Sequence, residues 1–218
     1  AMANFPHVVP YIDIPLQHAT DNMLDSMRRN VKAEQQSKLL KRLREKIPNV
    51  AIRTTFITGF PGETEEDHQA LKEYIKCHQF EAMGVFKYSN EKGTVAGSME
   101  NNDLLRISTA VKEQREEELM LTQQDIAFER AANAAKEKES CQVLIDSFIG
   151  ETAEGQLFLY KGRTEQQAPD VDANTIVMSE KKLHIGSINL CIITDHDGYD
   201  MIARPNEDLE RVVSLPLR

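Results

Sequence analysis

The chain has 218 residues, of which 40% are hydrophobic and 28% are charged. This balance is typical of a soluble globular protein with room for one large or two small domains, and no apolar run approaches the roughly 20 residues of a membrane span. The net charge of −9 argues against a general nucleic-acid binder, which needs a basic face. It suits a small cationic ligand or a basic protein partner.

The three cysteines, Cys77, Cys141 and Cys191, lie too far apart in the sequence for a Cys-x-x-Cys metal clip or a disulfide framework. We therefore expect a reducing, cytoplasmic environment. Cys77 lies beside Ile75 on a predicted helix, and we expect it to be a buried structural thiol.

The first half of the chain alternates between predicted strands and helices. β-Branched and aromatic runs predict strands at 8–16, 53–58 and 83–88, and apolar residues at helical spacing predict helices at 20–29, 33–47 and 63–78. This order indicates parallel β/α units. Residues 103–139 contain no glycine or proline and predict one long helix or two abutting ones, with a charged, solvated face.

From Ser140 onward the sequence changes to short β segments separated by turns. Five such segments, at 141–146, 156–161, 174–178, 188–194 and 199–203, predict a small closed antiparallel barrel of the OB-like kind. The expected fold class is therefore α/β plus all-β. The expected domains are residues 4–139 and 140–206, followed by a tail at 207–218.

Residues 53–63 form a strand that breaks into the turn Gly59-Phe60-Pro61-Gly62, and a helix follows with Thr64 as its N-cap. This layout is typical of a ligand loop at the carboxyl end of a parallel strand, although a purely structural turn remains the alternative. The carboxylates at 63 and 65–67 disfavour phosphate at this helix start. The ligand is therefore expected to be neutral or to carry a positive centre.

Two further groups have both a functional and a structural interpretation. Gln17 and His18 follow the first strand, where barrel enzymes place functional side chains, but His18 also suits a hydrogen-bonded structural role. The aspartates at 195, 197 and 200 lack the length and the closing glutamate of an EF-hand calcium loop.

Three stretches, at 11–18, 53–67 and 84–94, together resemble the radical-SAM methylthiotransferases, and the predicted barrel looks like their TRAM domain. The patterns at 162–172 and 196–200 are similar to the RimO branch, whose members methylthiolate an aspartate β-carbon of a small-subunit ribosomal protein. The tRNA-modifying, MiaB-like branch carries a different loop at 168–172 and remains an alternative. The resemblance covers about residues 6–204 and implies a partial (half) radical-SAM β/α barrel followed by a TRAM domain.

The resemblance also implies roles for individual positions. Gly59 and Gly62 would allow close backbone approach to S-adenosylmethionine, and the strand at 85–88 would give backbone contacts to its adenine edge. The full set implied on the S-adenosylmethionine side is Gln17, His18, Arg53, Ile57, Gly59, Phe60, Pro61, Gly62, Glu63, Val85 and Phe86. Partner-binding positions in the TRAM domain are Arg163, Asp170 and Asp172.

One departure from the family is large. The family needs a Cys-x-x-x-Cys-x-x-Cys loop for its catalytic 4Fe-4S cluster and three more cysteines for a second cluster, and the cysteines of this chain match neither set. We therefore expect a C-terminal piece of the enzyme that has no catalytic residue or metal site of its own, is inactive and holds no cofactor. The strand edge between Val8 and Ile14 would then be open and is expected to pair with another copy.

Charge favours a protein partner for the predicted TRAM domain. From Lys138 to Arg204 there are eleven acidic and six basic residues, a net charge of −5. An acidic barrel is a poor phosphate binder and suits a basic ribosomal protein, so tRNA is the less favoured partner. A complete, non-enzymatic partner-binding module remains the alternative to an enzyme fragment.

Overall fold

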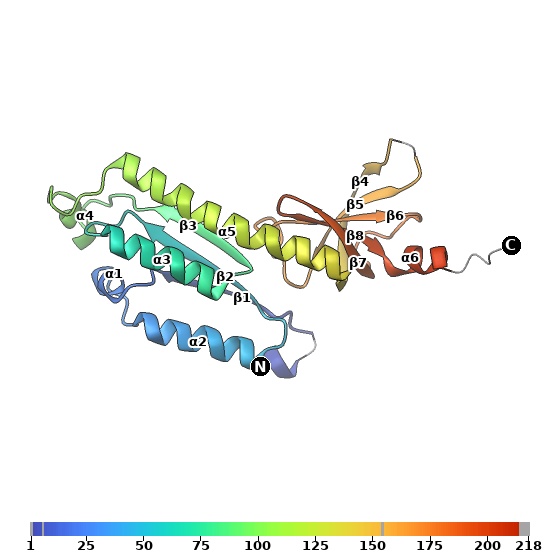
Figure 1. The fold of residues 1–218 in the computed structure, drawn as a ribbon, viewed down its shortest axis with the longest axis horizontal. Coiled ribbons are helices and arrows are strands. Elements are labelled where there is room, and N and C mark those ends of the chain that lie inside the picture. Colours follow the sequence, from blue (N-terminus) through green and yellow to red (C-terminus); the bar gives the residue numbers. More distant parts are fainter. Residues whose placement is uncertain (1, 6, 154, 214–218) are drawn as a thin grey trace. The chain divides into compact units, whose positions relative to one another are not determined.

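The computed structural model of the protein describes residues 2–5, 7–153 and 155–213. The chain divides into two compact units, Ala1–Ile126 and Ala127–Arg218, which are described separately below (Figure 1). The division falls within the long helix α5 (Thr109–Glu137), whereas the domain boundary predicted from the sequence lies after residue 139, at the start of the first barrel strand.

The first unit is a three-stranded parallel sheet with the order β1-β2-β3. Its strands are β1 (Tyr11–Gln17), β2 (Ala51–Thr58) and β3 (Ala82–Lys87). Its helices are η1 (Met2–Asn4), α1 (Asp21–Ser26), α2 (Ala33–Lys46), α3 (Glu65–His78), α4 (Val95–Glu100) and the first part of α5. The alternation of strands and helices confirms the parallel β/α prediction.

Two local features differ from the sequence-based expectation. The stretch between the third strand and the long helix, for which the sequence predicts no helix, contains helix α4. This helix begins after Thr94, whose Oγ1 accepts a hydrogen bond from the backbone N–H of Gly97 at 2.9 Å. The long helix starts at Thr109 rather than at 103. Just before it, the Asn102 side chain accepts a hydrogen bond from the backbone N–H of Leu104 at 3.1 Å, and this kind of local bond competes with a helix.

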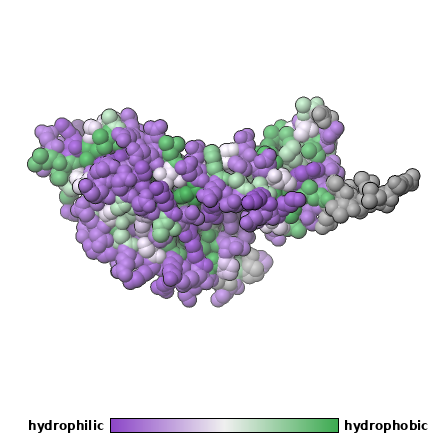
Figure 2. Space-filling model, viewed as in Figure 1, coloured by the Kyte–Doolittle hydropathy of each residue, from purple (hydrophilic) through white to green (hydrophobic). Residues whose placement is uncertain are grey.

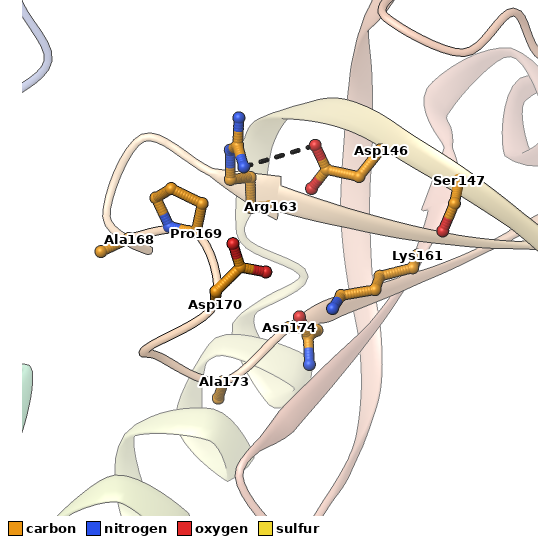
Figure 3. Close-up of a pocket in the computed structure, with 9 residues that line it drawn as sticks. All are labelled: Asp146, Ser147, Lys161, Arg163, Ala168, Pro169, Asp170, Ala173 and Asn174. Carbon is orange, nitrogen blue, oxygen red and sulfur yellow. Dashed lines mark ion pairs between the residues drawn. The ribbon is translucent and has the colours of Figure 1, made fainter.

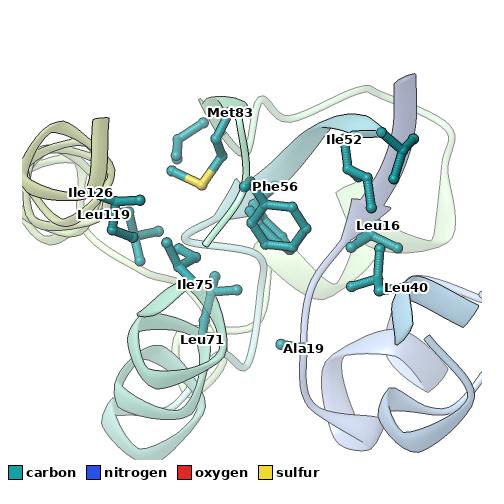
Figure 4. Close-up of a cluster of buried hydrophobic side chains, with 13 residues drawn as sticks. Leu16, Ala19, Leu40, Ile52, Phe56, Leu71, Ile75, Met83, Leu119 and Ile126 are labelled. Atoms are coloured by element: carbon teal, nitrogen blue, oxygen red, sulfur yellow. The ribbon is translucent and has the colours of Figure 1, made fainter. Parts of the chain in front are cut away.

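Helices cover one face of the sheet and bury the core of the first unit there (Figure 4). Phe56 lies at the centre of this core, with the rings of Tyr74 and Phe80 at centroid distances of 6.4 and 5.8 Å. The other buried side chains of the cluster are Leu16, Ala19, Leu40, Val50, Ile52, Leu71, Ile75, Met83, Val85, Leu119 and Ile126. Alternation along β2 places Arg53, Thr55 and Ile57 on the opposite face, where each is only half-buried. We call this opposite side the open sheet face.

Cys77 is exposed, so the expectation of a buried thiol is wrong. Helix α3 buries Leu71 and Ile75, and a residue two positions after Ile75 points to nearly the opposite side of an α-helix. Hydrophilic residues dominate the surface along the helices of this unit in Figure 2. Within the described residues, none of the helices combines the length and the apolar character that crossing a membrane requires.

The second unit is a closed five-stranded barrel with the order β4-β5-β6-β8-β7, which confirms the OB-like prediction. Its strands are β4 (Ser140–Glu151), β5 (Phe158–Thr164), β6 (Thr175–Ser179), β7 (Ile188–Asp197) and β8 (Asp200–Pro205). The pairs are antiparallel except for β6 and β8, which run parallel. Val143, Ile145, Tyr160, Val177, Cys191 and Ala203 fill the interior.

Two helical segments pack on the barrel within this unit. Phe128, near the end of α5, contacts the ring of Tyr199 at 5.2 Å and the ring of His196 at 6.4 Å. Helix α6 (Asn206–Val213) occupies most of the expected tail and lies beside β7 and β8. The last positions of that tail, 214–218, lie outside the described residues.

Candidate functional site

His18 follows the carboxyl end of β1 and is completely buried. Its Nδ1 accepts a hydrogen bond from the backbone N–H of Thr20 at 3.2 Å, and its Nε2 lies 3.4 Å from Oε1 of Glu63. This pattern assigns the proton to Nε2, which then donates to the carboxylate. The imidazole therefore links the end of β1 to the loop after β2 from inside the fold. Gln17, the last residue of β1, is half-buried and has a left-handed φ of 72°.

Glu63 is a buried carboxylate, 3% exposed, whose charge is compensated within the protein. Its Oε2 lies 3.1 Å from NH1 of Arg115 and also accepts a hydrogen bond from the backbone N–H of Gly59. The hydroxyl of Thr58 donates to its Oε1 at 3.4 Å. Because these partners come from β2, its loop and α5, Glu63 fixes the loop and is not free to bind a cationic ligand.

The Gly59–Gly62 loop is covered by the chain itself. Both glycines have left-handed φ angles, 69° and 85°, and a Cβ at Gly59 would collide with the side-chain stem of Lys112. The Gly62 N–H donates to the backbone oxygen of Leu105 at 2.8 Å. The absence of a side chain at Gly59 therefore makes room for the Lys112 stem of α5.

The apolar residues of the loop are buried as well. Phe60 is 6% exposed and packs edge to face on Tyr88 at 5.1 Å, and Pro61 is also buried. Neither side chain offers appreciable surface to a ligand in this conformation.

The acidic start of α3 is also used internally. A hydrogen bond from the Gln69 side chain lowers the pKa of Glu65, and the nearby Arg115 lowers it further. Burial alone would raise the pKa of Asp67, but hydrogen bonds from Thr20, Thr64 and Asn22 outweigh it and lower the pKa. Together with the contacts of Glu63, these contacts give most carboxylates of this turn a partner within the protein, so no bound cation is needed to compensate their charge. The acidic residues of this turn are therefore no evidence for a cationic ligand.

The open sheet face carries the predicted residues that a ligand could reach. Arg53 pairs with Asp13, its direct neighbour in the β1–β2 register, at 2.6 Å between NH1 and Oδ2. Ile57 and Phe86 are also direct neighbours, across β2 and β3, and Phe86 is 62% exposed. The side chain of Val85 points into the core and is 8% exposed, so only its backbone could take part.

The barrel contains a polar hollow of about 180 Å³ between β4, β5 and the loop that follows β5 (Figure 3). Arg163 lines it and pairs with Asp146 at 3.4 Å. Asp170 and Lys161 face the hollow from opposite sides (Figure 3), and the side chain of Lys161 has no hydrogen-bond or ion-pair partner among the described residues. The two basic and two acidic side chains cancel, so the hollow selects neither anions nor cations strongly.

Asp172, the third predicted partner-binding residue, does not line this hollow. Its carboxylate accepts a hydrogen bond from the backbone N–H of Ala168 at 2.8 Å and so holds the loop in shape. Arg163, Asp170 and Asp172 are predicted together as partner-binding residues, but only the first two line the hollow.

The residues present do not fit an iron–sulfur cluster. Among the described residues, no three histidine, cysteine, aspartate or glutamate side chains converge on a metal position. Cys141 and Cys191 lie opposite each other on β4 and β7 inside the barrel, and Cys77 is on the surface of the other unit. This arrangement lacks the cluster of thiolates that such a group requires.

Two cations of α5, Lys112 and Arg115, were not predicted as part of the site. Both are buried against the Gly59–Glu63 loop. In the sequence they lie in a helix rich in charged residues, and no pattern in that stretch distinguishes them from its solvent-exposed charges. Only the position of α5 on the sheet reveals them.

Comparisons with known proteins agree with this architecture. Residues 1–75 match the radical SAM superfamily and residues 139–205 match the TRAM domain. The chain is 40% identical over 203 residues to a protein of Trichlorobacter lovleyi named ribosomal protein uS12 methylthiotransferase RimO, covering 93% of this chain and 43% of that relative.

Proteins of the same name in other bacteria show similar values. The relative of Lachnoclostridium phytofermentans is 42% identical over 192 residues, covering 88% of this chain and 41% of the relative. That of Geobacter sulfurreducens is 39% identical over 199 residues, covering 91% and 42%. The chain thus spans about two fifths of the length of these relatives. With its part of a radical-SAM domain and its TRAM barrel, the chain is similar along about 90% of its length to a portion of the radical-SAM methylthiotransferases.

Proposed function

We propose that this chain is part of a methylthiotransferase that modifies an aspartate β-carbon of ribosomal protein uS12. The observation that carries the proposal is the similarity over 93% of the chain to a relative named as a ribosomal protein uS12 methylthiotransferase; the aspartate β-carbon follows from the family resemblance of the sequence. In this proposal the first unit supplies one wall of an S-adenosylmethionine site and the barrel binds the protein substrate. The radical chemistry belongs to a cluster that these residues do not fit, so we expect the chain by itself to be inactive.

The wall for S-adenosylmethionine is proposed on the open sheet face. Phe86 is an exposed aromatic ring next to the half-buried Ile57, and the two offer the flat apolar surface that an adenine ring needs. Arg53 lies further down β2 on the same face. Gly59, Phe60, Pro61, Gly62 and Glu63 would then support this wall from behind and would not contact the ligand with their side chains.

Binding of uS12 is proposed for the barrel because of its net charge of −5 between Lys138 and Arg204. Opposite charges steer association and favour a basic protein over tRNA. Since charges cancel at the polar hollow, the acidic residues outside it would carry the attraction. Asp195 and Asp197, near the end of β7, are exposed candidates.

The test is binding of purified uS12 and of tRNA to the whole 218-residue chain at low and moderate salt. We expect uS12 to bind and added salt to weaken the complex. Reversing both charges, with Asp195→Lys and Asp197→Lys, should weaken binding, whereas Glu73→Lys on α3 of the other unit should not. Preference for tRNA would favour the tRNA-modifying alternative, and binding of neither would contradict the proposed partner.

We also propose that the chain self-associates through the edge of β1. Within the described residues β1 pairs only with β2 and forms an edge of the sheet, and such an edge promotes pairing with another chain. Light scattering over a range of concentrations should show dimers or larger species. A monomer at every concentration would contradict this.

A further inference from the structure

Helix α5 carries two buried cations in the stretch between the two matched domains. Lys112 is 8% exposed and Arg115 is 7% exposed. The radical SAM match ends at residue 75 and the TRAM match begins at residue 139, so neither match includes them. A buried cation must be paired and hydrogen-bonded to be tolerated, and the partners of these two define what they do.

Arg115 contacts the Gly59–Glu63 loop and the start of α3. Its NH1 donates to the backbone oxygen of Glu63 at 3.2 Å and lies 3.1 Å from the Oε2 of the same residue. Its NH2 reaches Glu65 at 3.4 Å. Because Glu63 in turn accepts hydrogen bonds from Gly59 and Thr58, one guanidinium fixes both ends of the loop.

Lys112 connects the same loop to the residues after β3. Its Nζ lies 3.0 Å from Glu100 and 3.4 Å from the backbone oxygen of Tyr88, and 5.0 Å from the centre of the Tyr88 ring. Its side-chain stem fills the space beside Gly59. The backbone N–H of Tyr88 donates to Thr58 at 2.9 Å. The ends of β2 and β3 are thus held together from the helical side of the sheet.

We propose that Arg115 and Lys112 are positioning residues, which hold the Gly59–Glu63 loop and the end of β3 in place for a ligand on the open sheet face. The identity of that ligand as S-adenosylmethionine rests on the proposed function. If the two cations had only a structural role, they would stabilise the first unit as a whole and would have no selective effect on the loop. The proposal therefore requires a local effect.

Amide exchange of the isotopically labelled 218-residue chain separates the two roles. Arg115→Ala should speed exchange of the Gly59 and Gly62 amides by about tenfold or more, because it removes the charge-assisted hydrogen bonds that hold Glu63 and its loop. The Phe56 amide in the middle of β2 should keep its rate, since local openings are smaller than global unfolding. Arg115→Lys should restore part of the protection.

Two further variants sharpen the result. Arg106→Ala removes a surface ion pair with Asp103, whose side chains are 58% and 85% exposed, and should change none of these rates. Lys112→Met keeps the stem against Gly59 but removes the charge, so it should speed exchange at Tyr88 and leave Gly59 protected. Equal acceleration at Phe56 and Gly59 in Arg115→Ala, or none at either, would overturn the proposal.

A titration of the same chains with millimolar S-adenosylmethionine tests the ligand separately, with the amide signals of Gly84 and Phe86 as the readout. We expect shifts at both in the unmodified chain and in Arg106→Ala, and about tenfold weaker binding in Arg115→Ala. Undiminished binding by Arg115→Ala would overturn positioning while leaving the ligand wall intact. Absence of shifts in the unmodified chain would instead overturn the proposed wall, and with it the role of the two cations toward this ligand.

Discussion

The carboxylate of Asp208 accepts a hydrogen bond from the backbone N–H of Glu180 at 2.9 Å, across 28 positions of sequence. Asp208 is 2% exposed and lies in the first turn of α6, beyond the part of the chain that matches the TRAM domain. Lys181 and Glu207 form an ion pair beside it at 3.3 Å. Helix α6 is therefore anchored to the loop after β6 and is part of the barrel unit.

Asp208→Ala should lower the free energy of unfolding of the barrel by about 1–3 kcal/mol, because it removes a buried carboxylate that accepts a charge-assisted hydrogen bond from the Glu180 backbone. Glu207→Ala is the matched control. It removes only the exposed ion pair with Lys181 and should cost at most about 0.5 kcal/mol. Denaturant unfolding of the two variants provides the comparison, and equal losses would contradict the anchoring role of Asp208.

The start of α3 depends on a capping box between Thr64 and Asp67. The Thr64 hydroxyl accepts the Asp67 backbone N–H at 3.1 Å, and the Asp67 side chain accepts the Thr64 N–H at 3.1 Å. Thr64→Ala should lower the free energy of unfolding of the first unit by about 1 kcal/mol. Thr64→Ser keeps the hydroxyl and should retain most of the stability, so an equal loss in urea unfolding would rule out the cap as the cause.

Glu118 should make the first unit sensitive to acid. Hydrogen bonds from Lys72, Gln114 and His68 lower its pKa from 4.5 to about 2. Because the pKa is lower in the folded state, the stabilisation is complete above the unfolded value near 4.5 and is lost as the pH falls toward about 2.

Glu118→Gln should therefore be less stable than the unmodified chain at neutral pH, and this difference should shrink across that acid range. Thermal unfolding at a series of pH values measures it. Glu117→Gln, at an exposed neighbouring position, is the control and should leave the acid sensitivity in place. A constant difference between Glu118→Gln and the unmodified chain would refute the assignment.

The three thiols should react at very different rates. Burial raises the pKa of Cys141 to about 11 and that of Cys191 to about 12, whereas Cys77 is exposed on α3. Since the thiolate is the reactive form, a maleimide at mildly alkaline pH should modify Cys77 first and the other two only after unfolding. Mass spectrometry of digested protein locates the label, and Cys77→Ser should abolish the fast reaction. Fast labelling of Cys191 in the folded chain would count against its burial.

Much of the fold could be predicted from the sequence because its signals are local. The β-branched run at 54–58, the glycine turn and the Thr64 cap predict β2 and α3, and both are present. The start of the long helix could not be predicted in the same way. Composition favours a helix from 103, but an Asn102 side-chain bond and the contact between Leu105 and Gly62 hold that stretch outside it.

The candidate site could be predicted only in part. Periodicity is enough to place Arg53 and Ile57 on one face of β2, and the structure shows that this face is open. The sequence does not reveal that Phe60 and Pro61 are buried, because nothing near them shows that α5 lies over the loop.

The sequence by itself determined the family resemblance, the order of strands and helices, and the change from α/β to β-barrel. These follow from patterns within short stretches of chain. Tertiary structure decided which charges are free: Glu63 looks like a ligand-binding carboxylate in the sequence, but in the fold it is paired with Arg115, 52 positions later. The physical reason is that burial and ion pairing depend on residues that meet only when the helices pack on the sheet.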